Sequence, residues 1–126
     1  MAATVKDLMS AARAAVPAIT PAEAAALVKS ADALIVDVRD GTEVKASGKV
    51  KGAVAVSRGL LEFRADPDSP AHLPEFRKDR PILLYCASGG RSALAGKTLR
   101  DMGFSDVRNL GGFKDWVDSG GEVEPG

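Results

Sequence analysis

The sequence predicts an α/β domain in which helices cover both faces of a parallel sheet. Two apolar runs, 33–38 and 81–86, are rich in Ile, Leu and Val. Such runs are typical of strands that are buried on both sides. Segments with helical spacing of their apolar residues stand between and around these strands, and this alternation is typical of parallel sheets.

Two helices are predicted before the first strand. Apolar residues recur at helical spacing over 5–16, and Pro17 ends this helix. Thr20 is placed to cap a second helix, with Pro21 at its first position and Glu23 where it closes a capping box.

The remaining elements follow the two strands. The segment 56–80 contains several Pro and Gly residues and no clear period, which predicts a long loop with about one helical turn. A helix is expected over 91–102, with Gly103 as its C-terminal cap. A short strand over 106–110 and a last helix over 113–120 complete the prediction.

Length and composition indicate one folding unit. The chain has 126 residues, 45% of them hydrophobic, which is enough for one core. We expect a single domain over 1–126, with a helical extension at 1–18 and the domain core at 19–126. Because 17 basic residues balance 17 acidic ones, no overall charge favours binding to nucleic acid or to a membrane.

The chain has one cysteine and one histidine, so neither an intrachain disulfide nor a cluster of metal ligands is expected. We therefore predict no metal and no cofactor. Lys6, Asp7 and Arg13 interrupt the apolar N-terminal segment, which argues against a signal peptide. These features predict a cytoplasmic protein.

The stretch YCASGGRS follows the second buried strand and leads into a helix, which is where open α/β sheets bind ligands. Gly89 and Gly90 allow the backbone N–H groups to converge on one point, and Arg91 adds positive charge. These features favour the thiolate of Cys86 and predict a nucleophile. The alternative is a cysteine that only packs at the end of a strand.

From about Ile19 onward, the chain resembles the rhodanese-like, or thiosulfate sulfurtransferase, domains. LIVDVRDGTEV resembles the first motif of that family, and GKVKGAVAV resembles the second, with Lys49 where the family usually has His. The most specific likeness is YCASGGRSALAGKTLRDMGFSDVRNLGGFKDW. The resemblance implies a parallel sheet of about five strands and a reaction in which Cys86 accepts a sulfane sulfur and passes it on.

The resemblance also implies the partners and the site. Expected partners are a small anionic sulfur donor and a thiol or cyanide acceptor, with a protein donor or acceptor as a further option. Cys86 and Arg91 are the expected catalytic residues. The expected substrate-binding residues are Ala87, Ser88, Gly89, Gly90, Ser92 and Arg58.

Three residues near the first strand are predicted to have structural roles. Asp37 and Arg39 end that strand at the same edge of the sheet as Cys86, so contact with the substrate is the alternative for them. Arg39 is expected to form an ion pair with Glu43, four residues further on.

Two other functions stay open. Cysteine-dependent phosphatases use a similar loop, and some share this fold. They place one more residue between cysteine and arginine than the four found between Cys86 and Arg91. The shorter loop favours sulfur over a phosphoryl group. A sulfur-carrier or regulatory module is the second alternative, although such modules are usually recognised by a missing cysteine.

Overall fold

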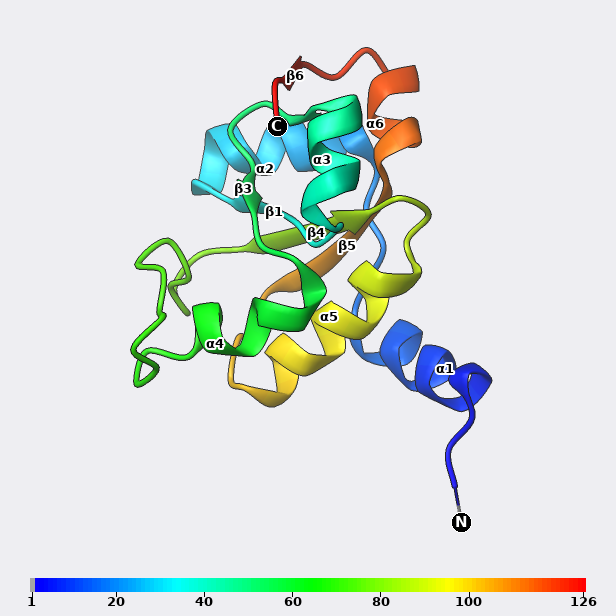
Figure 1. The fold of residues 1–126 in the computed structure, drawn as a ribbon, viewed down its shortest axis with the longest axis vertical. Helices are drawn as coiled ribbons and strands as arrows, with labels where there is room; N and C mark the ends of the chain where they lie inside the picture. The colour runs from blue at the N-terminus through cyan, green and yellow to red at the C-terminus, as the bar shows by residue number, and fades with distance from the viewer. Residues whose placement is uncertain (1) are drawn as a thin grey trace.

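The computed structural model describes residues 2–126. Its central sheet has four parallel strands in the order β3-β1-β4-β5 (Figure 1). The strands are β1 Leu34–Asp37, β3 Val54–Ala55, β4 Ile82–Cys86 and β5 Val107–Gly112. The two apolar runs therefore form β1 and β4 as predicted, and they are neighbours in the middle of the sheet.

The expected fifth strand is reduced to a single bridge. Ala18 pairs in parallel with Asn109 beyond β5. The N–H of Asn109 donates to the carbonyl of Pro17, and the N–H of Ile19 donates to the carbonyl of Asn109. Pairing stops there because proline has no N–H to donate and the chain enters a helix after Thr20.

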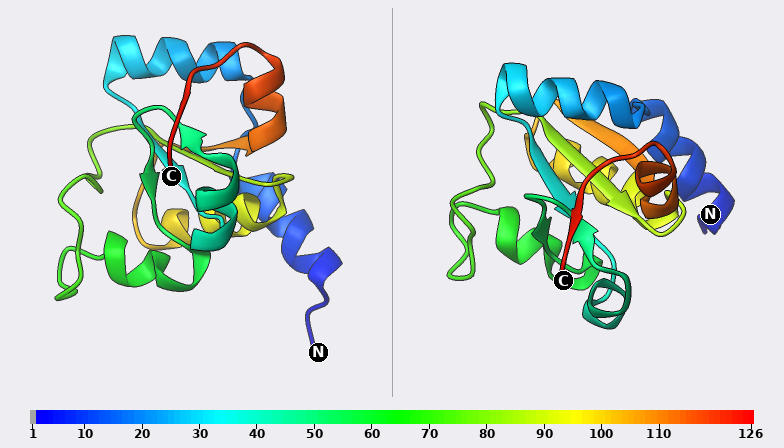
Figure 2. Two further views of the ribbon diagram at one scale, coloured as in Figure 1. Left: turned by 45° about the horizontal axis from the view of Figure 1, so that its top comes forward. Right: turned by 90° about the horizontal axis from the view of Figure 1, so that it is seen from above.

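Helices cover both faces of the sheet (Figure 1). One face packs against α1, α4 and α5, and the other packs against α2 and α6. Helix α3 lies beyond the carboxyl end of β1 (Figure 2). The helices are α1 Val5–Ala15, α2 Pro21–Ala31, α3 Gly41–Ser47, α4 Leu61–Ala65, α5 Gly90–Asp101 and α6 Phe113–Asp118.

The capping signals of the sequence are confirmed. Thr20 Oγ1 accepts a hydrogen bond from the N–H of Glu23 at 3.1 Å, and Glu23 Oε1 accepts one from the N–H of Thr20 at 2.9 Å. This reciprocal pair satisfies two N–H groups at the start of α2 that have no partner within the helix. The same arrangement joins Thr4 and Asp7 at the start of α1.

The middle of the chain has more regular structure than predicted. A 3-10 turn, η1 Arg58–Leu60, leads directly into α4 within the segment expected to be a loop. Short strands β2 Lys49–Val50 and β6 Val123–Glu124 pair antiparallel at the edge of the molecule. Lys49 Nζ holds this pairing by donating to Glu124 Oε1 at 2.5 Å.

Alternation along β4 divides its side chains between two hydrophobic cores. Leu84 and Cys86 face α4 and α5, whereas Leu83 and Tyr85 face α2 and α6. The cysteine is therefore the last residue of a central strand, and its side chain is directed toward the helix that follows it.

Helix α1 packs closely against α5. A Cβ atom placed on Gly96 would lie 2.9 Å and 3.0 Å from the two methyl carbons of Val16. The absence of a side chain at Gly96 therefore lets the segment after α1 approach the middle of α5.

Candidate active site

The sulfur of Cys86 lies within the turn that opens α5. The N–H of Gly89 donates to Cys86 Sγ at 3.1 Å, and Ser92 Oγ lies 3.5 Å from the same atom. Gly89 has a φ of +100°, a conformation that glycine adopts without the strain that a Cβ atom would bring. This turn directs the N–H groups at the start of α5 toward the sulfur.

The expected substrate-binding residues of this loop surround the sulfur but differ in exposure. Ala87 and Ser88 are exposed to solvent, and Gly89 and Gly90 are half-buried. Ser92 is fully buried beneath them. An incoming molecule can therefore reach the exposed side of the loop, at Ala87 and Ser88, whereas Ser92 contacts the sulfur from the buried side.

Two opposing effects set the pKa of Cys86. Burial of the sulfur raises this pKa, but hydrogen bonds from the Ser92 hydroxyl and from the backbone N–H groups of Ser92, Ser88 and Gly89 lower it. The hydrogen bonds outweigh the burial, so the pKa of the thiol lies below its ordinary value. A lowered pKa increases the thiolate fraction at neutral pH, and the thiolate is the nucleophilic form.

Arg91 is paired with a residue from another element. Its guanidinium donates to Glu43 Oε1 at 2.6 Å and to Glu43 Oε2 at 3.0 Å, which joins α5 to α3. This bidentate contact holds the pKa of Glu43 down, from 4.5 to about 2, and raises the pKa of Arg91. The positive charge next to the cysteine is thus largely balanced by a carboxylate.

The prediction that Arg39 forms an ion pair with Glu43 is wrong. Arg39 instead contacts Asp37, with its Nη2 atom 2.7 Å from Asp37 Oδ2 and its Nε atom 3.0 Å from Asp37 Oδ1. Both side chains are almost fully buried. A fully buried carboxylate two residues away is the stronger partner for a buried guanidinium, and it leaves Glu43 free to reach Arg91.

Asp37 and Arg39 belong to a network on the opposite face of the sheet from Cys86. Tyr85 Oη donates to Asp37 Oδ2 at 2.6 Å and accepts from the N–H of Val50 at 3.0 Å. The guanidinium of Arg39 also lies 4.3 Å from the centre of the Phe113 ring. These contacts connect β1, β2, β4 and α6, which is a structural arrangement and not one that faces the cysteine.

Arg58 is placed beside α5 and not at the loop. Its Nη1 atom donates to Glu62 and its Nη2 atom donates to Thr98, each at 3.0 Å. Both bonds direct the guanidinium along α4 and α5, away from the turn at Cys86. The expectation that Arg58 binds substrate therefore has no support from these contacts.

Sequence reasoning missed Asn109, a residue of β5 that contacts the cysteine loop directly. Asn109 Oδ1 accepts from Ser92 Oγ at 2.8 Å, and Asn109 Nδ2 donates to the carbonyl of Gly89 at 3.2 Å. The sequence offers only a weak signal for this role, a polar residue shortly before two glycines in a predicted strand.

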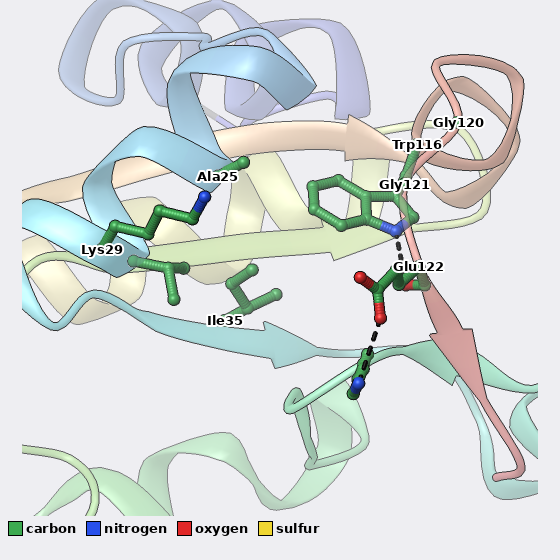
Figure 3. Close-up of a pocket in the computed structure, with 9 residues that line it drawn as sticks. Ala25, Lys29, Ile35, Trp116, Gly120, Gly121 and Glu122 are labelled. Carbon is green, nitrogen blue, oxygen red and sulfur yellow. Dashed lines mark hydrogen bonds and ion pairs between the residues drawn. The ribbon is translucent and has the colours of Figure 1, made fainter.

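A cleft of about 520 Å³ opens on the other face of the sheet (Figure 3). Trp116 and Ile35 form its floor, and Ala25 and Lys29 of α2 form one wall. Trp116 and Ile35 belong to the core that packs against α2 and α6, whereas Cys86 belongs to the core that packs against α4 and α5. The cleft is therefore separate from the cysteine loop.

Two features are not found among residues 2–126. No helix there combines the length and the apolar character needed to span a membrane. No three side chains of His, Cys, Asp or Glu lie together in a way that could hold a metal ion.

Comparison with known proteins identifies the family. The family model for the rhodanese-like domain matches residues 20–119. A sulfurtransferase of Allochromatium vinosum is 34% identical over 95 residues, which cover 75% of this chain and 80% of that protein. An uncharacterized protein of Bacillus subtilis is 36% identical over 93 residues, and the match covers 73% of this chain but only 64% of the Bacillus protein.

Solved structures agree in fold. A protein of unknown function from Rhodopseudomonas palustris, described as a possible tyrosine phosphatase, is 42% identical with a TM-score of 0.88, and the match covers 98% of this chain and 96% of that one. A polysulfide-sulfur transferase homodimer of Wolinella succinogenes is 34% identical with a TM-score of 0.75, covering 96% and 87%.

The order of the strands, the cysteine at the end of β4 and the match over residues 20–119 agree with one another. The chain belongs to the rhodanese-like domain family.

Proposed function

We propose that this protein is a sulfurtransferase that moves a sulfane sulfur through a persulfide on Cys86. In the first step, the Cys86 thiolate attacks the outer sulfur of thiosulfate. A new S–S bond forms, the S–S bond of thiosulfate breaks, and sulfite leaves with the electron pair. In the second step, cyanide or a thiolate attacks the outer sulfur of the persulfide, and the Cys86 thiolate is released.

The observation that carries this proposal is the set of donors directed at Cys86 Sγ. The Gly89 N–H lies 3.1 Å from the sulfur and the Ser92 hydroxyl lies 3.5 Å from it. Donors that favour the thiolate also favour the anionic persulfide, because both place negative charge within the same turn. Arg91 is proposed to orient the donor once its contact with Glu43 opens.

A cysteine-dependent phosphatase is the second candidate, because the Rhodopseudomonas relative is described as a possible tyrosine phosphatase. One observation weighs against it. Only four residues separate Cys86 and Arg91, which favours a single sulfur atom over a phosphoryl group with three oxygens.

Mass spectrometry of the intact protein tests the proposal. Incubation with thiosulfate should add one sulfur atom to the wild-type protein and none to the Cys86→Ser variant, and cyanide should remove the sulfur as thiocyanate. Both proteins should remain folded, since a hydroxyl occupies nearly the same volume as the thiol. The proposal fails if no sulfur is bound while an aryl phosphate is hydrolysed by the wild-type protein and not by the variant.

The donor is part of the proposal and needs its own measurement. Turnover with thiosulfate should be compared with turnover when a persulfide-bearing protein is the donor, because a carrier module would be loaded only by the second. We further propose a reducing compartment such as the cytoplasm as the place of action, since the cycle requires a free thiol at Cys86.

A further inference from the structure

A β-bulge aims the side chain of Asn109 at the cysteine loop. Leu84 pairs with Asn109 and Tyr85 pairs with Gly111, so Leu110 is an extra residue in β5. Gly111 follows with a φ of +92°, which glycine accommodates readily. Bulges next to active sites re-aim side chains in this way. Here the bulge places one amide between the start of α5 and the end of β5.

The neighbours of Asn109 fix the orientation of its amide group. The N–H of Gly111 donates to Asn109 Oδ1 at 2.9 Å, and the carbonyl of Gly89 accepts from Asn109 Nδ2 at 3.2 Å. If the amide were reversed, its NH₂ group would face the N–H of Gly111, which is also a donor, and its oxygen would face the carbonyl of Gly89, which is also an acceptor. The atom 2.8 Å from Ser92 Oγ is therefore an oxygen, and it must accept the hydroxyl proton of Ser92.

This orientation creates competition for a single proton. The Ser92 hydroxyl has one proton to donate, and both Asn109 Oδ1 and Cys86 Sγ lie within reach of its oxygen. With a neutral thiol, the S–H group donates to Ser92 Oγ, and the hydroxyl donates to Asn109. With an anionic sulfur, the hydroxyl must turn away from Asn109 in order to donate to the sulfur.

We propose that Asn109 is a positioning residue that sets how readily the Ser92 hydroxyl donates a hydrogen bond to the Cys86 sulfur. Turning the hydroxyl about its C–O bond breaks one O–H···O contact and forms one O–H···S contact, with no change in covalent bonding. Asn109 Oδ1 then keeps the Gly111 N–H as its donor. The effect of Asn109 on the Cys86 thiolate is inferred from the geometry alone. The same effect on a Cys86 persulfide rests on the proposed function.

Charged groups on the surrounding elements must stay constant in a test. Arg91 lies on α5 next to the sulfur, and Glu43 and Asp40 lie on or beside α3. Arg58 lies on η1, where it pairs with Glu62. On the β5 side, Asp115 approaches Gly111. Substitutions at Asn109 and Ser92 leave all of these charges in place.

The test measures how the rate of Cys86 alkylation by iodoacetamide depends on pH. Cys86 is the only cysteine of the chain, so the measured rate belongs to this residue. Asn109→Leu removes the competing acceptor, so the pKa of Cys86 should fall by about 0.5 to 1 unit relative to wild type. Asn109→Asp keeps an acceptor and adds negative charge, so the pKa should rise. Both variants lose the donor to Gly89, so a role limited to holding the loop would move both values in the same direction.

The Ser92→Ala background separates the two explanations further. If Asn109 acts through Ser92, adding Asn109→Leu to Ser92→Ala should leave the pKa within about 0.2 units of the single Ser92→Ala variant. A shift that persists in this background overturns the proposal, as does an upward shift in Asn109→Leu alone. If circular dichroism shows that Asn109→Leu does not fold, Asn109→Asp is compared with and without Ser92→Ala. The rise in the Cys86 pKa caused by Asn109→Asp should be smaller when Ser92 is replaced. An equal rise in both backgrounds overturns the proposal.

This experiment is independent of sulfur transfer. If wild-type Cys86 is alkylated normally but takes no sulfur from thiosulfate or from a persulfide, the proposed function fails while the role of Asn109 is still decided. If sulfur transfer is confirmed and the alkylation profiles do not move, only the role of Asn109 is overturned.

Discussion

Replacing Glu43 with glutamine tests whether its ion pair with Arg91 limits the use of an anionic sulfur donor. In the structure both carboxylate oxygens of Glu43 accept from Arg91, at 2.6 Å and 3.0 Å. Under the proposed function, thiosulfate displaces this contact when it reaches the guanidinium. Glutamine keeps the size of the side chain but removes the charge, so it should release Arg91 for the donor.

The magnitude follows from the strength of the pair. The fall in the pKa of Glu43 from 4.5 to about 2 corresponds at face value to about 3 kcal/mol. However, the side chains of Arg91 and Glu43 are 37% and 35% exposed, so solvent screening reduces the pair to about 1 kcal/mol. An energy of about 1 kcal/mol corresponds to about a fivefold change in an equilibrium constant.

We therefore expect Glu43→Gln to lower KM for thiosulfate about fivefold and to change kcat by less than about twofold. The assay is thiocyanate formation at saturating cyanide over a range of thiosulfate concentrations. An uncharged sulfane-sulfur donor, such as an organic trisulfide, should show no comparable gain, because it does not need the guanidinium.

Glu62→Gln is the matched control, because Glu62 forms a similar pair with Arg58 at 3.0 Å on η1 and α4. Its KM for thiosulfate should stay at the wild-type value. An unchanged or higher KM in Glu43→Gln would refute the reasoning and would show that Arg91 needs Glu43 to hold it in place.

The same pair predicts how stability depends on pH. The folded-state pKa of Glu43 is below its unfolded value of 4.5, so the pair stabilises the fold above that pH. This contribution should be lost as the pH falls from about 4.5 to about 2. Urea denaturation of wild type and Glu43→Gln should therefore differ at pH 6, with the difference shrinking toward pH 3.

Three further predictions concern the core and the loop. Tyr85→Phe should lower the free energy of unfolding, measured by urea denaturation, by about 2 to 4 kcal/mol. The reason is that the buried N–H of Val50 loses its acceptor and the carboxylate of Asp37 loses a donor. A change below about 1 kcal/mol would contradict this prediction. Gly96→Ala should destabilise the protein to thermal unfolding although alanine favours helices, because the new methyl group would meet Val16 at 2.9 Å, and adding Val16→Ala should reverse the loss. Arg91→Ala should weaken turnover with thiosulfate more than turnover with an uncharged donor, and equal losses would show that Arg91 only shapes the loop.

The three longer strands β1, β4 and β5, most helices and the cysteine turn were predictable because their signals are local. Apolar runs mark β1 and β4, and the residues Thr20, Pro21 and Glu23 mark the start of α2 within four positions of the chain. The two glycines before Arg91 mark the turn around the sulfur in the same way. Each of these features depends on residues that are neighbours in sequence.

The rest of the site depends on residues that only the fold brings together. Glu43 and Arg91 are 48 residues apart, and helical spacing suggested Arg39 as the partner of Glu43. A preference that is reasonable for an exposed helix failed because Arg39 is buried beside Asp37. Asn109 was missed because its direction depends on a bulge, and a single extra residue in a strand leaves no periodic pattern to detect.

The separation of these partners along the chain also bears on folding. The donors at Gly89 and Ser92 follow the cysteine immediately, but Asn109 comes 17 residues after Ser92, and Glu43 approaches only when α3 docks beyond β1. During synthesis, Cys86 therefore emerges before the strand that orients its serine. A chain that has not yet added β5 to the sheet lacks both contacts of Asn109 with the cysteine loop, so the loop reaches its final set of hydrogen bonds only when the sheet is complete.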